Sequence, residues 1–126
     1  MAKEFYDLNI WRKGYDLLIK VYELTLKYPH EEKYGLISDT RRSANSIIAN
    51  IAESHGRFYF ADKIRVLYIS RGEVEEVRSH LKIGSGLGYL SEENFKILDT
   101  EYQGLSKGIN VYISSLHEQS QQLQQK

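Results

Sequence analysis

The sequence predicts an all-α protein, an antiparallel up-down-up-down four-helix bundle, and three observations lead to that fold class. Apolar residues recur at spacings of three and four along four long segments, which is the period of an amphipathic helix. Strand-like alternation does not persist, and the single proline, Pro29, stands between two of these segments. The links between segments are short, so consecutive helices are expected to pack side by side in opposite directions.

The chain has 126 residues, which is enough for one domain with an ordinary core. We expect the bundle to occupy residues 1–118. The glutamine-rich stretch 119–126 is polar, and we expect it to be a disordered tail.

The overall charge is balanced, with 17 Lys and Arg against 17 Asp and Glu. This balance argues against a strongly basic nucleic-acid or membrane binder, although a local basic patch remains compatible with it. The absence of cysteine excludes disulfides and cysteine metal sites. No signal peptide and no apolar run of about 18 residues is present, so we expect a soluble, cytoplasmic protein with no membrane partner.

The first segment ends at Pro29, and Asp7 is placed to cap its N-terminus. Its side chains at three- and four-residue spacing are expected to face the core: Leu8, Trp11, Tyr15, Leu18, Tyr22 and Thr25.

The second segment follows Gly35 and is expected to run to Ser54 or His55, with Gly56 as a left-handed C-cap. Several members of its apolar stripe are small, which would let a neighbouring helix approach closely. That stripe comprises Ile37, Thr40, Ala44, Ile47, Ile51 and Ser54.

The third segment begins near Ala61 or Asp62, and its stripe comprises Leu67, Ser70, Val74, Val77, Leu81 and Gly84. The fourth segment has a clear start, because Ser91 can cap a helix that opens with two glutamates. Its stripe comprises Phe95, Leu98, Tyr102, Leu105, Ile109, Tyr112 and Leu116. A separate line of small or apolar residues on this segment suggests contact with a second protomer: Gly104, Gly108 and Val111.

No residue pattern predicts an enzyme. A di-iron bundle needs Glu-x-x-His pairs, and no histidine here has a glutamate three residues before it. The glycine-rich run 84–88 follows a helix and is better explained as a turn than as a phosphate loop. No general acid, base or nucleophile can be assigned, and we expect no cofactor, no metal and no small-molecule substrate.

Cations near the second segment are the candidates for binding. Arg41 and Arg42 lie near its start, where they could pair with Asp39, Glu31 or Glu32, or else contact phosphate or a neighbouring protomer. Both alternatives stay open at the level of sequence.

The link between the second and third segments places Arg57, Lys63 and Arg65 around three consecutive aromatic residues, 58–60. Phe58 and Tyr59 could stack on unpaired bases while the cations hold phosphate. Alternatively, Phe58 and Phe60 could simply cover the end of the bundle.

On the third segment, Arg71, Glu75, Arg78 and Lys82 form a line beside the core stripe. Opposite charges at helical spacing predict an internally paired, solvated face. Contact with nucleic acid is the alternative for this face.

Several stretches together resemble the four-helix-bundle family of proteins encoded in intervening sequences of 23S rRNA genes. The resemblance covers about residues 5–116. The most specific pieces are Tyr34-Gly35-Leu36, Arg41-Arg42, Asn50-Ile51-Ala52-Glu53 with Gly56-Arg57, and Leu87-Gly88-Tyr89-Leu90. The chain departs from the usual family pattern at Ser54 and at residues 71–73.

That family is similar to the accessory variability determinant protein of diversity-generating retroelements, a basic pentamer of four-helix bundles that binds nucleic acid. The resemblance therefore implies a homo-oligomer, a pentamer in particular, and a role near RNA or a ribonucleoprotein. The absence of catalytic patterns adds the expectation that this role is non-enzymatic. The expected RNA contacts are Arg41, Arg42, Arg57, Lys63 and Arg65. The competing hypothesis is a structural adaptor whose oligomer binds a protein partner and not nucleic acid.

Overall fold

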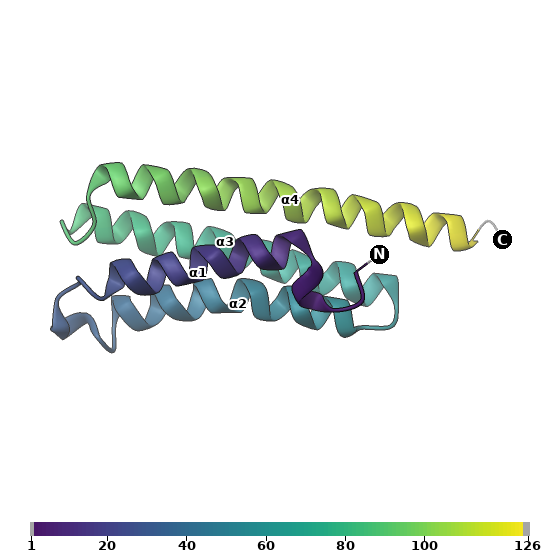
Figure 1. Ribbon diagram of the computed structural model, residues 1–126, viewed down its shortest axis with the longest axis horizontal. Coiled ribbons are helices and arrows are strands. Elements are labelled where there is room, and N and C mark those ends of the chain that lie inside the picture. The colour runs from purple at the N-terminus through teal and green to yellow at the C-terminus, as the bar shows by residue number, and fades with distance from the viewer. Residues whose placement is uncertain (1, 125–126) are drawn as a thin grey trace.

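The computed structural model describes residues 2–124, and these form four long helices (Figure 1). The helices are α1 (Asn9–Thr25), α2 (Leu36–Gly56), α3 (Phe60–Gly86) and α4 (Glu92–Gln124). Two short 3-10 helices accompany them, η1 (Phe5–Asp7) before α1 and η2 (His30–Glu32) between α1 and α2. No strand occurs in this part of the chain. The predicted all-α class and four-helix bundle are confirmed.

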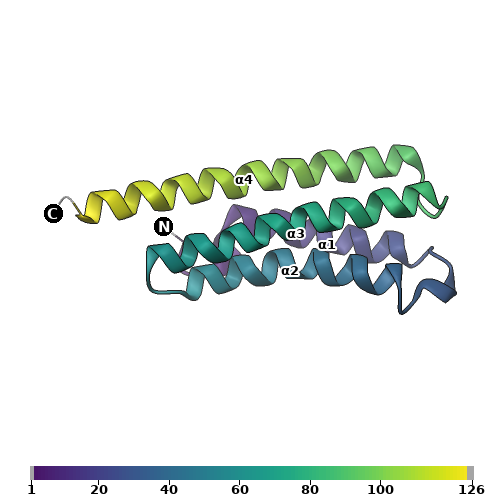
Figure 2. The ribbon, with the colours of Figure 1, turned by 180° about the vertical axis from the view of Figure 1, so that it is seen from behind.

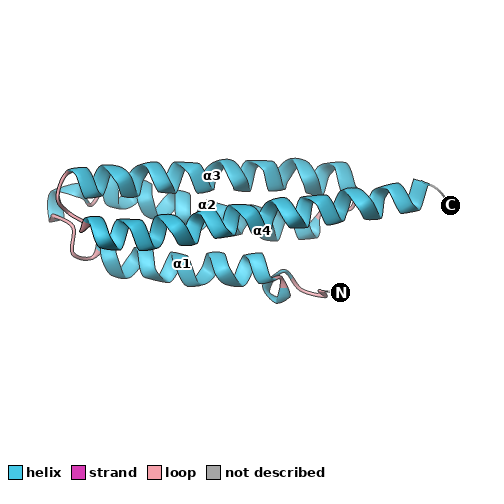
Figure 3. Cartoon of the chain, turned by 90° about the horizontal axis from the view of Figure 1, so that it is seen from above, coloured by secondary structure: helices cyan, strands magenta, loops and turns pink. Residues whose placement is uncertain are grey.

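The helices pack in a ring. α1 contacts α2 and α4, and α3 contacts the same two helices, while the diagonal pairs α1–α3 and α2–α4 do not pack together within residues 2–124. The chain reverses direction from each helix to the next (Figures 1 and 2). The view from above shows that α4 is the longest and projects beyond the other helices at its C-terminal end (Figure 3).

The seam between α2 and α3 is the most extensive contact between helices. Small polar residues are buried on both helices, including Ser43 and Ser54 of α2 and Ser70 of α3. The Ser70 hydroxyl donates a hydrogen bond of 2.8 Å across the seam to the carbonyl oxygen of Ile47. A buried hydroxyl needs such a partner, because burying it without one costs free energy. The expectation that small residues admit a close neighbour is confirmed.

The core stripe predicted for α1 was wrong in part. Leu8 and Thr25 are buried and Trp11 and Leu18 pack against the core, as expected. The fully buried apolar residues of α1 include Leu17 and Val21, whereas Tyr15 and Tyr22 are both 44% exposed. α1 carries two apolar stripes side by side, and helical spacing alone cannot decide which of them faces inward. In the structure the face of α1 that carries Gly14 packs closely against α2, where any side chain at this position would collide with Ile48.

Two predicted caps differ from those observed. Asp7 lies in η1, where its carboxylate accepts a hydrogen bond from the Glu4 backbone, and it does not cap α1. Gly56 is the last residue of α2, and the chain leaves the helix through Arg57 in an extended conformation. The left-handed glycine is Gly88, with φ of 81°, in the turn after α3. The local sequence could not distinguish these glycines, because each follows a helical pattern.

The start of α4 agrees with the prediction. The Ser91 hydroxyl accepts a hydrogen bond of 3.1 Å from the backbone amide of Asn94. At the other end, α4 continues as a helix through Gln124, whereas we expected a disordered tail from residue 119. Glutamine and leucine are good helix formers, so the helix extends past the last core residue, Leu116. Residues 125–126 lie outside the described part.

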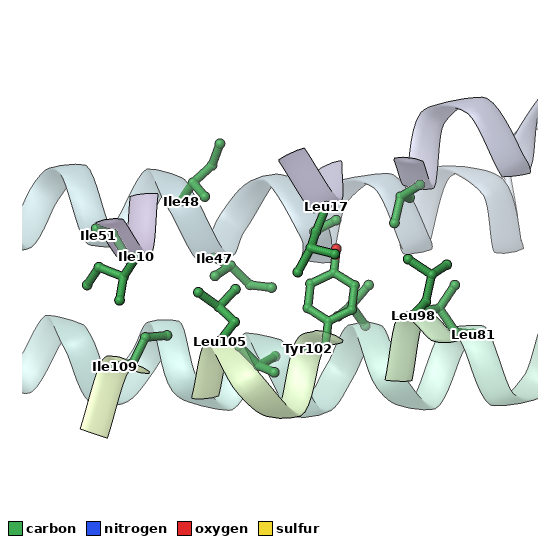
Figure 4. Close-up of a cluster of buried hydrophobic side chains, with 14 of the residues drawn as sticks. Ile10, Leu17, Ile47, Ile48, Ile51, Leu81, Leu98, Tyr102, Leu105 and Ile109 are labelled. Carbon is green, nitrogen blue, oxygen red and sulfur yellow. The ribbon is translucent and has the colours of Figure 1, made fainter. Parts of the chain in front are cut away.

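Tyr102 lies at the centre of the core and is completely buried (Figure 4). Its hydroxyl has no hydrogen-bond partner among the described residues, and burial raises the pKa of this phenol. The ring therefore stabilises the core through its apolar surface, while the hydroxyl opposes folding.

We predict that Tyr102→Phe raises the free energy of unfolding by about 1 kcal/mol, because it removes an unpaired buried hydroxyl and keeps the ring. Urea denaturation followed by circular dichroism measures the change. Tyr15→Phe is the control, since Tyr15 is half exposed, and it should change stability very little. A less stable Tyr102→Phe protein would show that the hydroxyl is satisfied in solution.

Candidate nucleic-acid interface

The structure divides the five predicted cations into two groups at opposite ends of α2. Arg41 and Arg42 lie near its start, and Arg57, Lys63 and Arg65 surround the link to α3. Arg42 and Arg57 are separated by about 22 Å along the helix, at about 1.5 Å for each residue. A single protomer therefore offers two separate cationic regions.

Arg41 closes the end of α1. Its Nε donates to the Thr25 hydroxyl at 2.9 Å, and its Nη2 donates to the Tyr22 carbonyl at 3.3 Å. The guanidinium also lies 4.4 Å from the centroid of the Tyr22 ring. All three contacts are to neutral groups, so the ion pair with Asp39, Glu31 or Glu32 that sequence suggested for this residue does not form in the described structure. Arg41 thus keeps a positive charge that no carboxylate neutralises.

Arg42 is more exposed and more weakly held. Its Nη2 lies 3.5 Å from a carboxylate oxygen of Asp39, and 61% of its side chain is exposed. An ion pair of this length at the surface contributes little to stability. Arg42 is therefore free to exchange Asp39 for an anionic ligand at small cost.

Two of the three cations at the α2–α3 link are engaged within the protein. Arg57 pairs with Glu53 at 2.5 Å, and this hydrogen bond raises the pKa of the guanidinium. The Lys63 ammonium donates to the carbonyls of His55 at 2.9 Å and Ser54 at 3.3 Å, so it caps the C-terminus of α2. Partial burial lowers the pKa of Lys63. Arg65 is exposed and has no ion pair within residues 2–124.

The aromatic residues of the link separate into two kinds. Phe60 packs against the core, as expected for a residue that covers the end of the bundle. Phe58 and Tyr59 instead point into solvent, with 86% and 67% of their surfaces exposed. Their rings meet edge to face at 5.0 Å. The alternative that Phe58 covers the bundle end was wrong, because Phe60 already fills that position.

Gly104, Gly108 and Val111 of α4 were predicted to contact a second protomer, but one of the three packs against α1 of the same chain. Gly108 admits the side chain of Ile10, because a Cβ atom there would lie 3.2 Å from Ile10 Cγ2. Nothing lies close to Gly104, and Val111 is 71% exposed. Gly108 therefore has an explanation within the protomer, while Gly104 and Val111 remain available at the surface.

A groove of about 400 Å³ lies between the end of α1, the η2 link and the start of α2. Sequence reasoning missed this site, because neither Lys33 nor Tyr34 was among the predicted binding residues. The two residues are adjacent, and the Lys33 ammonium lies 5.4 Å from the centroid of the Tyr34 ring. The residues that line the groove are Tyr22, Lys33, Tyr34, Ile37, Ser38, Arg41, Arg42 and Asn45.

The cations of α3 mostly serve the seam with α4. Arg78 donates from Nε to Asp99 at 2.6 Å and from Nη1 to Glu75 at 3.0 Å. Arg71 donates to the side-chain oxygen of Asn110 at 2.6 Å. The predicted internal pairing is seen between Arg78 and Glu75, and the partner on α4 makes Arg78 a link between helices.

The hydrogen bond from Arg78 lowers the pKa of Asp99. The folded protein therefore binds the Asp99 proton more weakly than the unfolded chain does. The resulting stabilisation is complete above the ordinary pKa of an aspartate, about 3.9, and it is lost as the pH falls through the lower pKa of the folded state.

We predict that Asp99→Asn lowers the free energy of unfolding at pH 7 by about 1–2 kcal/mol, because it removes a charge-assisted hydrogen bond between α3 and α4. The difference from the parent protein should shrink as the pH falls below about 4. Denaturation at pH 7 and pH 3 measures both effects. Glu75→Gln is the matched control: Glu75 also pairs with Arg78, but 64% of its side chain is exposed, so it should have a much smaller effect.

Other kinds of site find no support in the described structure. Within residues 2–124, no three histidine or acidic side chains are grouped so that they could hold a metal ion. In the same range, no helix combines the length and the apolar composition needed to cross a bilayer.

The fold and the surface together define a four-helix-bundle protein with cationic and aromatic groups at both ends of α2. The family model described as 23S rRNA-intervening sequence protein matches residues 6–111. The chain belongs to this family, as its sequence pattern predicted. No curated protein matches the chain.

A solved structure has the same fold. It is the crystal structure of a protein of unknown function from the S23 ribosomal protein family of Bacteroides thetaiotaomicron. The two chains are 23% identical, with a TM-score of 0.76, and the similarity covers 83% of this chain and 95% of the other. At this level of identity the comparison supports the fold and leaves the function to other arguments.

Proposed function

We propose that this protein binds RNA without catalysing a reaction, and that it does so as a homo-oligomer. The observation that carries the proposal is the exposed pair of rings at the α2–α3 link. Phe58 and Tyr59 project into solvent directly after Arg57, and Arg65 is exposed on the second turn of α3, in a chain of the 23S rRNA-intervening sequence protein family. Large exposed aromatic side chains in a cationic setting are typical of surfaces that stack on unpaired bases.

The neutral charge of the chain favours single-stranded RNA over a long duplex as the ligand. Duplex binding depends mainly on many phosphate contacts, and this protein has few cations free to make them. Stacking on aromatic rings supplies affinity that does not require a large positive charge. Arg65, and Arg57 once it gives up its surface pair with Glu53, would add a small number of phosphate contacts to the stacking by Phe58 and Tyr59.

Oligomerisation would strengthen such a site, since several weak patches on one particle act together. A pentamer is the state that the family resemblance implies. The outer face of α1 supports a contact between subunits, because Trp11 stacks on Tyr15 with centroids 5.3 Å apart and Tyr15 is half exposed. Aromatic residues are enriched in interfaces between proteins.

We predict that the parent protein binds a labelled single-stranded RNA, and that raising the salt from 50 to 200 mM weakens binding about tenfold, as expected for two or three phosphate contacts. The double variant Phe58→Ala with Tyr59→Ala should weaken binding about tenfold or more, because it removes the stacking surface. Fluorescence anisotropy measures both effects.

The control for charge compares two variants that introduce the same change at different places. Arg65→Glu should weaken RNA binding, whereas Lys96→Glu should not, because Lys96 lies at the start of α4, away from the link. Both side chains are exposed, so neither change should affect folding. A protein that binds no RNA at 50 mM salt would contradict the proposal.

The second candidate is a structural adaptor, and the aromatic face of α1 is the observation that favours it. On this account the oligomer forms but binds protein and not RNA. Tyr15→Asp should then dissociate the oligomer, as light scattering after size-exclusion chromatography would show, and RNA should bind neither the parent nor the variant. An oligomer that binds RNA, together with a monomeric variant that binds it more weakly, would favour the first candidate.

A further inference from the structure

We propose that the groove at the start of α2 holds one unpaired nucleotide of an RNA strand. The inference rests on the proposed RNA-binding function and extends it by a second site, about 22 Å along α2 from the rings at the link. Its volume of about 400 Å³ falls in the range of about 300–1,000 Å³ that is common for small-molecule sites.

The charge of the groove selects an anionic ligand. Lys33, Arg41 and Arg42 contribute three cations to its lining, and no carboxylate is among the lining residues. Acidic residues nearby are directed elsewhere. Glu32 accepts hydrogen bonds from the Leu36 amide and from the Tyr89 hydroxyl, and Asp39 faces Arg42 from outside the groove. Glu73 also interacts with the charge of Arg42 from outside the lining. Lys33 and Arg41 have no ion pair within residues 2–124, so an anion entering the groove meets mainly their positive charge.

The position of Arg41 is fixed before any ligand arrives. Its Nε and Nη2 are held by α1, through Thr25 and Tyr22, while Nη1 makes no hydrogen bond within residues 2–124. A guanidinium held in this way can present its remaining donors to phosphate with little further loss of side-chain freedom. Arg42 and Lys33 are less constrained and can close on the same phosphate.

The aromatic residues of the groove favour a ligand that carries a base as well as a phosphate. Tyr34 is 89% exposed, and its ring forms part of the groove lining together with that of Tyr22. Each ring has a cation near it, Arg41 at 4.4 Å from the Tyr22 centroid and Lys33 at 5.4 Å from the Tyr34 centroid, but Tyr22 is only 44% exposed, so the Tyr34 ring is the more open to stacking. Ser38 and Asn45 complete the lining with groups that can donate to and accept from the edge of a base.

This arrangement suits an unpaired nucleotide better than a duplex. In a duplex the bases are stacked on one another, and their faces cannot reach a protein ring. An unpaired nucleotide exposes both the face of its base and its phosphate. Tyr34 can stack on the base, and the three cations can bind the phosphate. Inorganic phosphate alone would use the cations and gain nothing from Tyr34.

The test uses an eight-nucleotide single-stranded RNA and the variant Tyr34→Ala. We expect affinity for this RNA to fall about fivefold or more, as for the loss of one base stack, while any binding to a duplex of the same sequence stays unchanged. Tyr68→Ala is the matched control. Tyr68 is likewise an exposed tyrosine beneath a cation, with 45% of its surface exposed and the Arg71 guanidinium 4.7 Å from its centroid, but it lies on α3 outside the groove.

Photocrosslinking locates the RNA independently of affinity. Trypsin releases residues 34–41 from the groove and residues 58–63 from the link as separate peptides, so mass spectrometry distinguishes the two sites. RNA attached to both peptides supports the proposal. RNA attached only to 58–63, or equal losses in the Tyr34 and Tyr68 variants, would overturn the groove site and leave the proposed function standing.

Two further probes establish the source of the ligand. Adenosine monophosphate should bind more weakly than the RNA, because it engages one site only, and inorganic phosphate should bind no differently to Tyr34→Ala and to the parent. Adenosine monophosphate that binds as tightly as the RNA would overturn the assignment to an RNA strand. If neither peptide is crosslinked and no RNA binds at low salt, the proposed function fails along with the groove site.

If the groove is instead covered by a neighbouring subunit, Arg42→Gln should shift the oligomeric state in light scattering and leave RNA binding by the isolated protomer unchanged. That result would also overturn the proposal. Arg42 is suited to this test because it is exposed, whereas Arg41 stabilises the end of α1.

Discussion

The close contact between α2 and α3 is the constraint on which the arrangement of the surface depends. Small buried residues and the hydrogen bond from Ser70 to the Ile47 carbonyl hold these two helices together along their length. The link between them, residues 57–59, is consequently short and has no room to fold Phe58 and Tyr59 inward once Phe60 fills the end of the bundle. The same contact fixes α2 as a rigid element with a different group of cations at each end.

Most of the cations near α2 and α3 contact groups of the protein itself, so few of them are free for a ligand. Arg41 and Lys63 satisfy carbonyl groups at the ends of α1 and α2, and Arg78 joins α3 to α4. Lys63 gives the His55 carbonyl a partner at the end of α2, whereas the Tyr22 carbonyl also accepts from the Leu26 amide. The cations without such contacts form a small set, and exposed aromatic rings lie near them.

The stripes of α2, α3 and α4 were predicted at positions that the structure buries or packs against the core. In α1 the prediction failed at two positions, since the structure buries Leu17 and Val21 while exposing Tyr15 and Tyr22. The face that α1 buries depends on the fit of Gly14 against Ile48, two residues 34 positions apart in the sequence. The sequence around Gly14 does not show this contact, because a glycine can be recognised as a site of close helix packing only when the residue that packs against it is known.

By itself the sequence determined the fold class, the four helices and the family, because helical periodicity, caps such as Ser91 and short motifs are local properties of the chain. Only the tertiary structure decided which cations are engaged and which are available. Hydrogen bonds act over about 3 Å, so the partners of Arg41 on α1 and of Arg78 on α4 are set by how the helices pack. The groove around Tyr34 has the same origin, since three segments must meet before its lining exists.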